Sequence, residues 1–207
     1  MSRPEGSVAI HVARGASYIL IQNVATNVMM VVSFAILARL ITPAEIGGMA
    51  VLLMVIGVSR VITCLGMPSS VTRFIAESMA KNDRETAAGV FYQAIRSSLL
   101  LSLPVAGAVF WWAEFLSKRL LGTPESTTLF QLLALDIVVA AGLLPALNSA
   151  MLGLRKIREM SLINLVYLVF RQSLIVVFTF ITRSLLGLVL AWVVSELAVA
   201  LAFLKYL

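Results

Sequence analysis

Five ionisable side chains lie within otherwise apolar stretches of the sequence: Arg60, Arg96, Asp136, Arg171 and Glu196. In the hydrocarbon core of a bilayer such a group costs at least about 2.5 kcal/mol on insertion scales, so it normally faces a protein interior or a water-filled cavity. Arginine presents a fork of N–H donors that matches phosphate oxygens. Three arginines against two carboxylates therefore favour an anionic ligand such as phosphate or pyrophosphate. The alternative is that these arginines pair with Asp136 and Glu196 and only hold helices together.

Uncharged polar side chains accompany the charges at helical spacing. Residues three, four or seven positions apart share a face of an α-helix. Such faces are formed by Gln22, Asn23, Thr26 and Asn27, by Tyr92, Gln93 and Arg96, and by Asn164, Tyr167 and Arg171. Polar faces on several helices predict a common hydrated interior, although amide hydrogen bonds between helices are the simpler alternative. The candidate uncharged lining residues are Gln22, Asn23, Asn27, Gln93, Asn164 and Tyr167.

The sequence lacks the residue sets that catalysis or metal binding needs. His11 is the single histidine and Cys64 the single cysteine, so neither can complete a metal site with a second His or Cys. There is no phosphate-binding glycine loop, no Ser/His/Asp set and no DxxD-like acidic motif. A basic face on a soluble fold, which nucleic-acid binding needs, is also absent. The sequence predicts no enzyme, no metal, no cofactor and no nucleic-acid partner.

The elements that would position these residues are membrane-spanning helices. Hydrophobic residues make up 60% of the 207 residues and charged residues 13%, with a mean hydropathy of +1.00; a soluble domain averages about 25% charged. In lipid every backbone amide must be satisfied within its own segment, so long apolar runs form helices rather than open sheets. At about 20 apolar residues per crossing, we expect an all-α integral membrane protein. Its six spans would cover residues 18–40, 46–65, 87–116, 127–152, 160–181 and 185–204.

Polar segments punctuate these spans. Residues 1–17 are predicted to form an interfacial lead-in, and residues 72–86 an interfacial helix and loop on the cytoplasmic side. Thr42-Pro43-Ala44-Glu45 has the pattern of a capping box with a first-turn proline and is expected to open the second span. Thr123-Pro124-Glu125 repeats this chemistry before the fourth span.

Lysine and arginine are distributed unevenly between the two sides of this topology. With Arg60, Arg96 and Arg171 inside the bilayer, nine of the other Lys and Arg residues lie on the side of the termini and four on the opposite side. The nine are Arg3, Arg14, Arg73, Lys81, Arg84, Arg155, Lys156, Arg158 and Lys205, and the four are Arg39, Lys118, Arg119 and Arg183. By the positive-inside rule, we expect a multi-pass protein of the cytoplasmic membrane with both termini in the cytoplasm.

Three segments near the N-terminus carry a family pattern. They are Gly15-Ala16-Ser17-Tyr18, the stretch Ala38-Arg39-Leu40-Ile41-Thr42-Pro43-Ala44-Glu45-Ile46-Gly47, and Gly66-Met67-Pro68-Ser69-Ser70-Val71-Thr72-Arg73-Phe74. They resemble the start of polysaccharide biosynthesis proteins, the O-antigen and teichoic-acid type flippases of the multidrug/oligosaccharidyl-lipid/polysaccharide exporter superfamily. The pattern Arg-Leu-x-x-Pro-x-x-x-Gly matches, although Ile46 stands where an aromatic residue is usual. The six-helix spacing extends the resemblance over the whole chain.

The resemblance implies a MATE-like fold, in which two six-helix lobes alternate access to the two sides of the membrane. Residues 1–207 would form the first lobe as a single domain, with a second lobe as partner, either another chain or a second copy. The implied activity is transfer of a polyprenyl-pyrophosphate-linked oligosaccharide from the cytoplasmic to the outer leaflet. Its partners would be this lipid-linked oligosaccharide and the surrounding membrane lipids. Arg60, Arg96 and Arg171 are the candidate pyrophosphate ligands.

Two other functions stay open at this point. A multidrug or small-solute antiporter of the same superfamily would use Asp136 or Glu196 as its proton or sodium site. A nontransporting subunit or truncated remnant would insert into the membrane and carry nothing. A cavity dominated by arginines favours the flippase, and one dominated by carboxylates favours the antiporter.

Overall fold

The computed structural model describes residues 5–65, 67–122 and 126–206. Residues 1–4 of the predicted lead-in and Thr123-Pro124-Glu125 of the second predicted helix start lie outside this part. Six helices are long and apolar enough to cross a membrane: Ser17–Leu40, Pro43–Cys64, Arg84–Trp111, Thr127–Gly153, Ile157–Thr182 and Leu185–Lys205. No strand occurs among the described residues. The prediction of an all-α membrane protein is confirmed.

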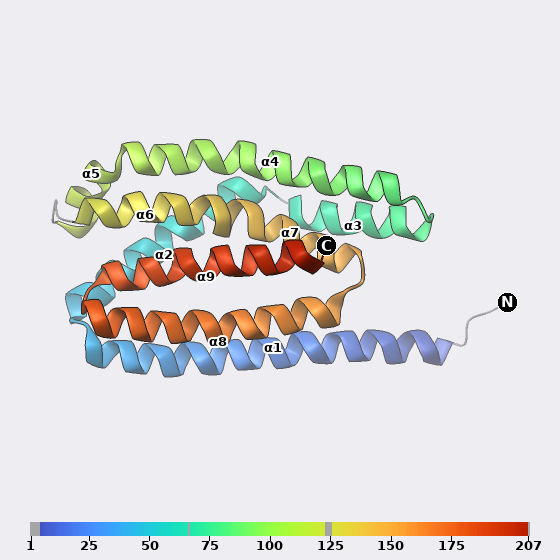
Figure 1. Cartoon of the computed structure of the whole chain (residues 1–207), viewed down its shortest axis with the longest axis horizontal. Coiled ribbons are helices and arrows are strands. Elements are labelled where there is room, and N and C mark those ends of the chain that lie inside the picture. Colours follow the sequence, from blue (N-terminus) through green and yellow to red (C-terminus); the bar gives the residue numbers. More distant parts are fainter. Residues whose placement is uncertain (1–4, 66, 123–125, 207) are drawn as a thin grey trace.

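The spans belong to a longer succession of helical elements (Figure 1). These are α1 (Glu5–Leu40), α2 (Pro43–Cys64), α3 (Met67–Ala80), α4 (Arg84–Trp111), α5 (Ala113–Leu116), η1 (Ser117–Leu121), α6 (Thr127–Ile137), η3 (Val138–Leu143), α7 (Leu144–Gly153), α8 (Ile157–Thr182) and α9 (Leu185–Tyr206). The elements η1 and η3 are π-helices. The fourth span consists of α6, η3 and α7 in direct succession.

Most helices run nearly parallel, whereas α2 runs obliquely behind them from the end of α1 to the start of α3 (Figure 1). α1 packs along α8, α8 along α9, and α9 against α6; α4 packs against α6, and α3 against both α4 and α7. Beyond the turn that joins them, α1 therefore packs along α8, while α2 packs along the fourth span. This divergence leaves room for a cavity between α1 and α2.

The main core lies where α2, α6 and α9 meet. Leu52, Phe130, Leu133, Leu188 and Val189 are at most 1% exposed and belong to one cluster. In a bilayer such packing stabilises through close van der Waals contact, because lipid tails are as apolar as the side chains themselves.

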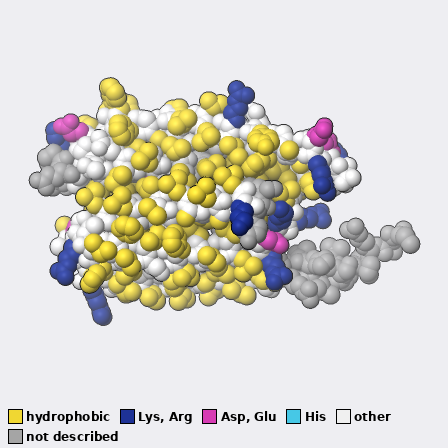
Figure 2. Space-filling model, in the orientation of Figure 1, with side chains coloured by type: hydrophobic (Ala, Val, Ile, Leu, Met, Phe, Trp, Pro, Cys, Tyr) yellow, Lys and Arg dark blue, Asp and Glu magenta, His cyan; other side chains and the backbone are white. Residues whose placement is uncertain are grey.

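The outer surface is apolar. Apolar side chains cover the face shown in Figure 2, and most of the charged side chains drawn there lie toward the two ends of the bundle. Val61, Trp111 and Ile181 are between 72% and 84% exposed. A continuous apolar surface of this size is unfavourable in water and suits hydrocarbon, as expected for a multi-pass membrane protein.

Three helix boundaries bear most directly on the sequence prediction. At the start of α2, the Thr42 N–H donates to Glu45 Oε2 at 2.9 Å and the Glu45 N–H donates to the Thr42 hydroxyl at 3.4 Å, which confirms the capping box. The third span, predicted to reach residue 116, ends at Trp111, because the Trp112 backbone leaves the helical region. Apolar side chains nevertheless continue on both sides of Glu114. The interfacial helix, predicted from residue 72, already begins at Met67.

The fourth span is irregular at its centre. Pro145 has no N–H and cannot donate to the Ala141 carbonyl, which an α-helix would otherwise satisfy. The Thr63 hydroxyl of α2 donates to this carbonyl instead, at 2.9 Å, and the Thr63 side chain is almost fully buried. This hydrogen bond holds α2 against the fourth span one turn from Arg60.

Candidate functional site

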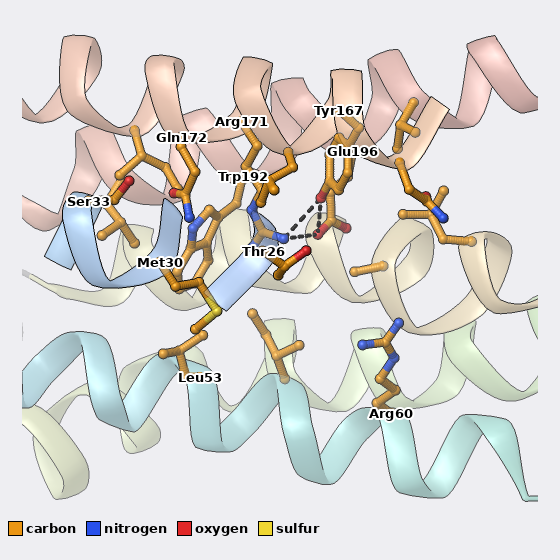
Figure 3. Close-up of a pocket in the computed structure, with 18 of the residues that line it drawn as sticks. Thr26, Met30, Ser33, Leu53, Arg60, Tyr167, Arg171, Gln172, Trp192 and Glu196 are labelled. Carbon is orange, nitrogen blue, oxygen red and sulfur yellow. Dashed lines mark hydrogen bonds and ion pairs between the residues drawn. The ribbon is translucent and has the colours of Figure 1, made fainter. Parts of the chain in front are cut away.

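A cavity of about 590 Å³ lies among α1, α2, α8, α9 and the segment formed by η3 and α7 (Figure 3). α1 contributes Gln22, Thr26, Met30, Ser33 and Leu37 to its wall. These residues are three or four positions apart, so they form a single helical face. The opposite side of α1 is exposed over most of its apolar length.

The cavity is apolar at one end and polar at the other. Leu37, Met49 and Leu188 line the end near the α1–α2 turn. Arg60 and Asn164 line the half toward the start of α1 and the end of α9, as do Gln22, Asn148 and Glu196. The polar half therefore lies on the side for which the Lys and Arg distribution predicts the cytoplasm.

Arg171 is held in the polar half by three side chains. Its Nη1 donates to the Tyr167 hydroxyl at 2.9 Å and lies 3.5 Å from Glu196 Oε1. The Tyr167 hydroxyl donates to the same Glu196 oxygen at 3.4 Å. The guanidinium also lies over the rings of Tyr167 and Trp192, 5.8 and 5.6 Å from their centroids, in the range of cation–π attraction. For this arginine the structure supports pairing with a carboxylate.

Arg60 has a different environment. It extends from α2 into the cavity, across from the Arg171–Tyr167–Glu196 cluster (Figure 3). Within the described residues no carboxylate lies within ion-pair distance of it. Its side chain is exposed and can reach a ligand in the cavity. Arg60 is thus the cationic lining residue whose N–H donors are not committed to a carboxylate.

Asp136 lies behind the wall that carries Glu196. It is 1% exposed, and its neighbours Glu196 and Arg171 are close enough to interact with it electrostatically. Both Asp136 carboxylate oxygens and Glu196 Oε2 are buried without a hydrogen-bond donor in the described part of the chain. No group of three His, Cys, Asp or Glu side chains among the residues described could hold a metal ion.

The structure places six of the eleven predicted site residues in the cavity lining, one directly behind it and four on outer faces. Gln22, Arg60, Asn164, Tyr167, Arg171 and Glu196 line the cavity, and Asp136 lies behind Glu196. Asn23, Asn27, Gln93 and Arg96 are exposed on outer faces. On α1, neighbouring residues point about 100° apart, so Asn23 and Asn27 turn away when Gln22 faces inward. α4 packs against α3 and α6 and against the outer sides of α2, η3 and α7, and none of its residues lines the cavity.

Several lining residues were not predicted. Asn148 of α7 accepts a hydrogen bond from Asn164 Nδ2 at 3.2 Å and donates to the Leu144 carbonyl at 3.1 Å. Gln172 and Trp192 line the same space. Asn148 and Gln172 lie inside apolar runs. Because polar side chains at membrane depth normally face the protein interior, these two could have been predicted to line the cavity. Trp192 carries no such signal, because a tryptophan in a span is compatible with lipid contact.

A cysteine at position 164 is expected to react with a membrane-impermeant maleimide, whereas a cysteine at position 166 is not. Both positions are on α8, but Asn164 lines the cavity while Val166 is 70% exposed on the apolar outer surface. Because the thiolate is the reactive form and needs water, we expect Asn164→Cys to be labelled at least about tenfold faster. The measurement uses the Cys64→Ser background.

A lipid-soluble maleimide provides the control for this labelling, since it should reach Val166→Cys from the membrane. If Asn164→Cys reacted only with the lipid-soluble reagent, the cavity would not be hydrated.

Comparison with known proteins agrees with this architecture. The family model described as polysaccharide biosynthesis protein matches residues 12–207. The chain belongs to the polysaccharide biosynthesis protein family. Members of this family are generally membrane transporters or flippases rather than enzymes, and the family supports a transport role in polysaccharide synthesis. No curated protein and no solved structure was found to match the chain.

Proposed function

We propose that the chain forms one lobe of a flippase in the cytoplasmic membrane, with both termini in the cytoplasm. Together with a second six-helix lobe, it moves a polyprenyl-pyrophosphate-linked oligosaccharide from the cytoplasmic to the outer leaflet by alternating access. The substrate is carried chemically unchanged, without a metal or cofactor. The observation that carries this proposal is the uncommitted guanidinium of Arg60 inside a cavity whose polar half lies on the predicted cytoplasmic side.

The distribution of charge favours an anionic headgroup at Arg60. Arg171 already contacts Glu196 and Tyr167, whereas Arg60 has N–H donors available for phosphate oxygens. The amides of Gln22, Asn148 and Asn164 line the same half of the cavity and can exchange hydrogen bonds with the polar groups next to the phosphate. The apolar end suits lipid or apolar linker atoms.

The size of the cavity supports a requirement for a second lobe. A volume of about 590 Å³ suits a drug-sized ligand, so it accommodates a pyrophosphate with its nearest substituents and not a whole oligosaccharide. α1 has the smallest share of buried residues among the six described spans, and it exposes Asn23 and Asn27 on its outer side. Polar amides facing hydrocarbon are costly, and a second lobe packed along the outer side of α1 would cover them.

A proton- or sodium-coupled antiporter for small solutes is the second candidate. The buried carboxyls of Asp136 and Glu196 favour it, because carboxylates at membrane depth mark ion pathways in transporters. The two candidates differ in their ligand: the flippase binds a pyrophosphate amphiphile through Arg60, and the antiporter binds a small solute without needing that arginine.

Replacing Arg60 by alanine is expected to weaken binding of a short-chain polyprenyl pyrophosphate by about tenfold to a hundredfold, since a hydrogen bond to a charged group contributes about 1.5–3 kcal/mol. Equilibrium binding of the radiolabelled lipid to the protein in nanodiscs measures this. Arg60→Lys should retain part of the affinity, because it keeps the charge and loses the fork.

The matched control is Arg96→Ala, which removes the same charge from an exposed position outside the cavity. It should bind as the parent protein does. Equal weakening by both substitutions, or no binding by the parent protein, would contradict the proposed ligand site.

A further inference from the structure

The base of the cavity contains an excess of negative charge. Asp136 and Glu196 are both at most 4% exposed, and both are close to a single arginine, Arg171. Among the described residues, the one further charged group that acts on Glu196 is Arg60, on the opposite wall and exposed. Tyr167 is the remaining titratable neighbour, and its hydroxyl donates to Glu196. A second uncompensated carboxylate at this depth would be strongly unfavourable.

The unsatisfied oxygens show where a positive species would be stabilised. Both oxygens of Asp136 and Oε2 of Glu196 are buried and lack a donor among the described residues. The two carboxyl groups are close enough to share a hydrogen bond when one of them carries a proton. Two facing carboxylates can only accept, so one added proton converts the pair into a donor and an acceptor.

A proton fits this site better than a metal ion does. Hard metal cations take about six oxygen ligands, while the hydroxyl of Ser195, the residue before Glu196 in the sequence, already donates to the Trp192 carbonyl at 2.9 Å. Arg171 also lies against Glu196 and would repel a metal ion. A proton needs only the two carboxyls.

We propose that Asp136 and Glu196 form a proton-binding site whose occupancy is linked to anion binding in the cavity. A proton passes from a hydronium ion in the hydrated cavity to a carboxylate oxygen: one O–H bond of the hydronium breaks, the carboxyl O–H bond forms, and a water molecule is left. With one proton on the pair, Arg171 offsets the single carboxylate that remains. The excess negative charge, which would weaken the attraction of an anion to Arg60, is then removed. By reciprocity, an anion in the cavity also favours uptake of the proton. The linkage rests on the proposed function, while the proton site itself does not.

Infrared spectroscopy tests the proton site without any ligand. The protein in nanodiscs at neutral pH should show the C=O stretch of a protonated carboxyl, and this band should vanish at high pH. Asp136→Asn and Glu196→Gln should each abolish it, because the single remaining carboxylate is compensated by Arg171. Glu114→Gln, at an exposed position outside the spans, should leave it intact. A parent protein without the band would overturn the site, with no variant needed.

The pH dependence of pyrophosphate-lipid binding tests the linkage. Above the pH at which the band disappears, affinity should fall by up to about tenfold per pH unit if one proton is taken up per anion. Asp136→Asn and Glu196→Gln should lose this dependence. Binding that does not change with pH would overturn the linkage and leave the flippase proposal standing. No binding at any pH would overturn the flippase proposal and the linkage together, and the infrared band would still decide the proton site.

Discussion

Replacing Arg171 by alanine is expected to lower the free energy of unfolding by about 3–5 kcal/mol, because it leaves buried carboxylates without their counter-ion. Its guanidinium donates a hydrogen bond to Tyr167 and pairs with Glu196, and among the described residues it is the cation that acts on Asp136. The substitution also removes cation–π contacts with two rings. Unfolding in mixed micelles with increasing denaturing detergent, followed by tryptophan fluorescence, measures the change.

Two comparisons separate the loss of the ion pair from the loss of a side chain. Arg96→Ala, at an exposed site, should change stability by no more than about 0.5 kcal/mol. The double substitution Arg171→Met with Glu196→Gln should cost less than the sum of the single changes, because the two partners are removed together. If Arg171→Ala unfolded at the same detergent fraction as Arg96→Ala, the ion pair would have no structural role.

The helices of this protein were predictable because a bilayer allows few alternatives. Every amide must be paired within its segment, so apolar runs of sufficient length become helices, and the capping box at Thr42 and Glu45 marks a start unambiguously. The ends of the helices were harder to predict. α4 stops at Trp111, but Trp112 and Phe115 continue the apolar run, and hydropathy alone does not register a break in the backbone.

The faces that meet in the cavity were only partly predictable. The spacing of Asn164, Tyr167 and Arg171 predicted a shared face of α8, because helical periodicity is local, and all three residues line the cavity. Periodicity does not tell which of the adjacent positions Gln22 and Asn23 turns inward. That choice depends on how α1 packs along α8, a contact between distant parts of the chain. The exposure of Arg96 was unpredictable for the same reason, because it depends on how α4 packs against other helices.

Translocation is expected to require both Arg60 and a second lobe. The cavity of a single lobe is too small for the oligosaccharide. In addition, the outer side of α1 is not covered by any other helix of the described lobe. Arg60→Ala should reduce the flipping rate at limiting substrate by about tenfold to a hundredfold, as its loss of a charged hydrogen bond implies. Arg96→Ala should flip at the parent rate, because it lies outside the cavity lining.

The most direct test combines mass and transport on the same preparation. The chain is purified in mild detergent so that any bound lobe stays attached, the mass of the assembly is measured, and the assembly is placed in liposomes with a fluorescent polyprenyl-pyrophosphate-linked oligosaccharide. A membrane-impermeant quencher then reports the labelled lipid that changes leaflet. We expect transport from assemblies that hold two six-helix lobes, and its loss with Arg60→Ala but not with Arg96→Ala. A strictly monomeric chain that flips the lipid, or an Arg60→Ala assembly that flips it at the parent rate, would contradict the proposed function.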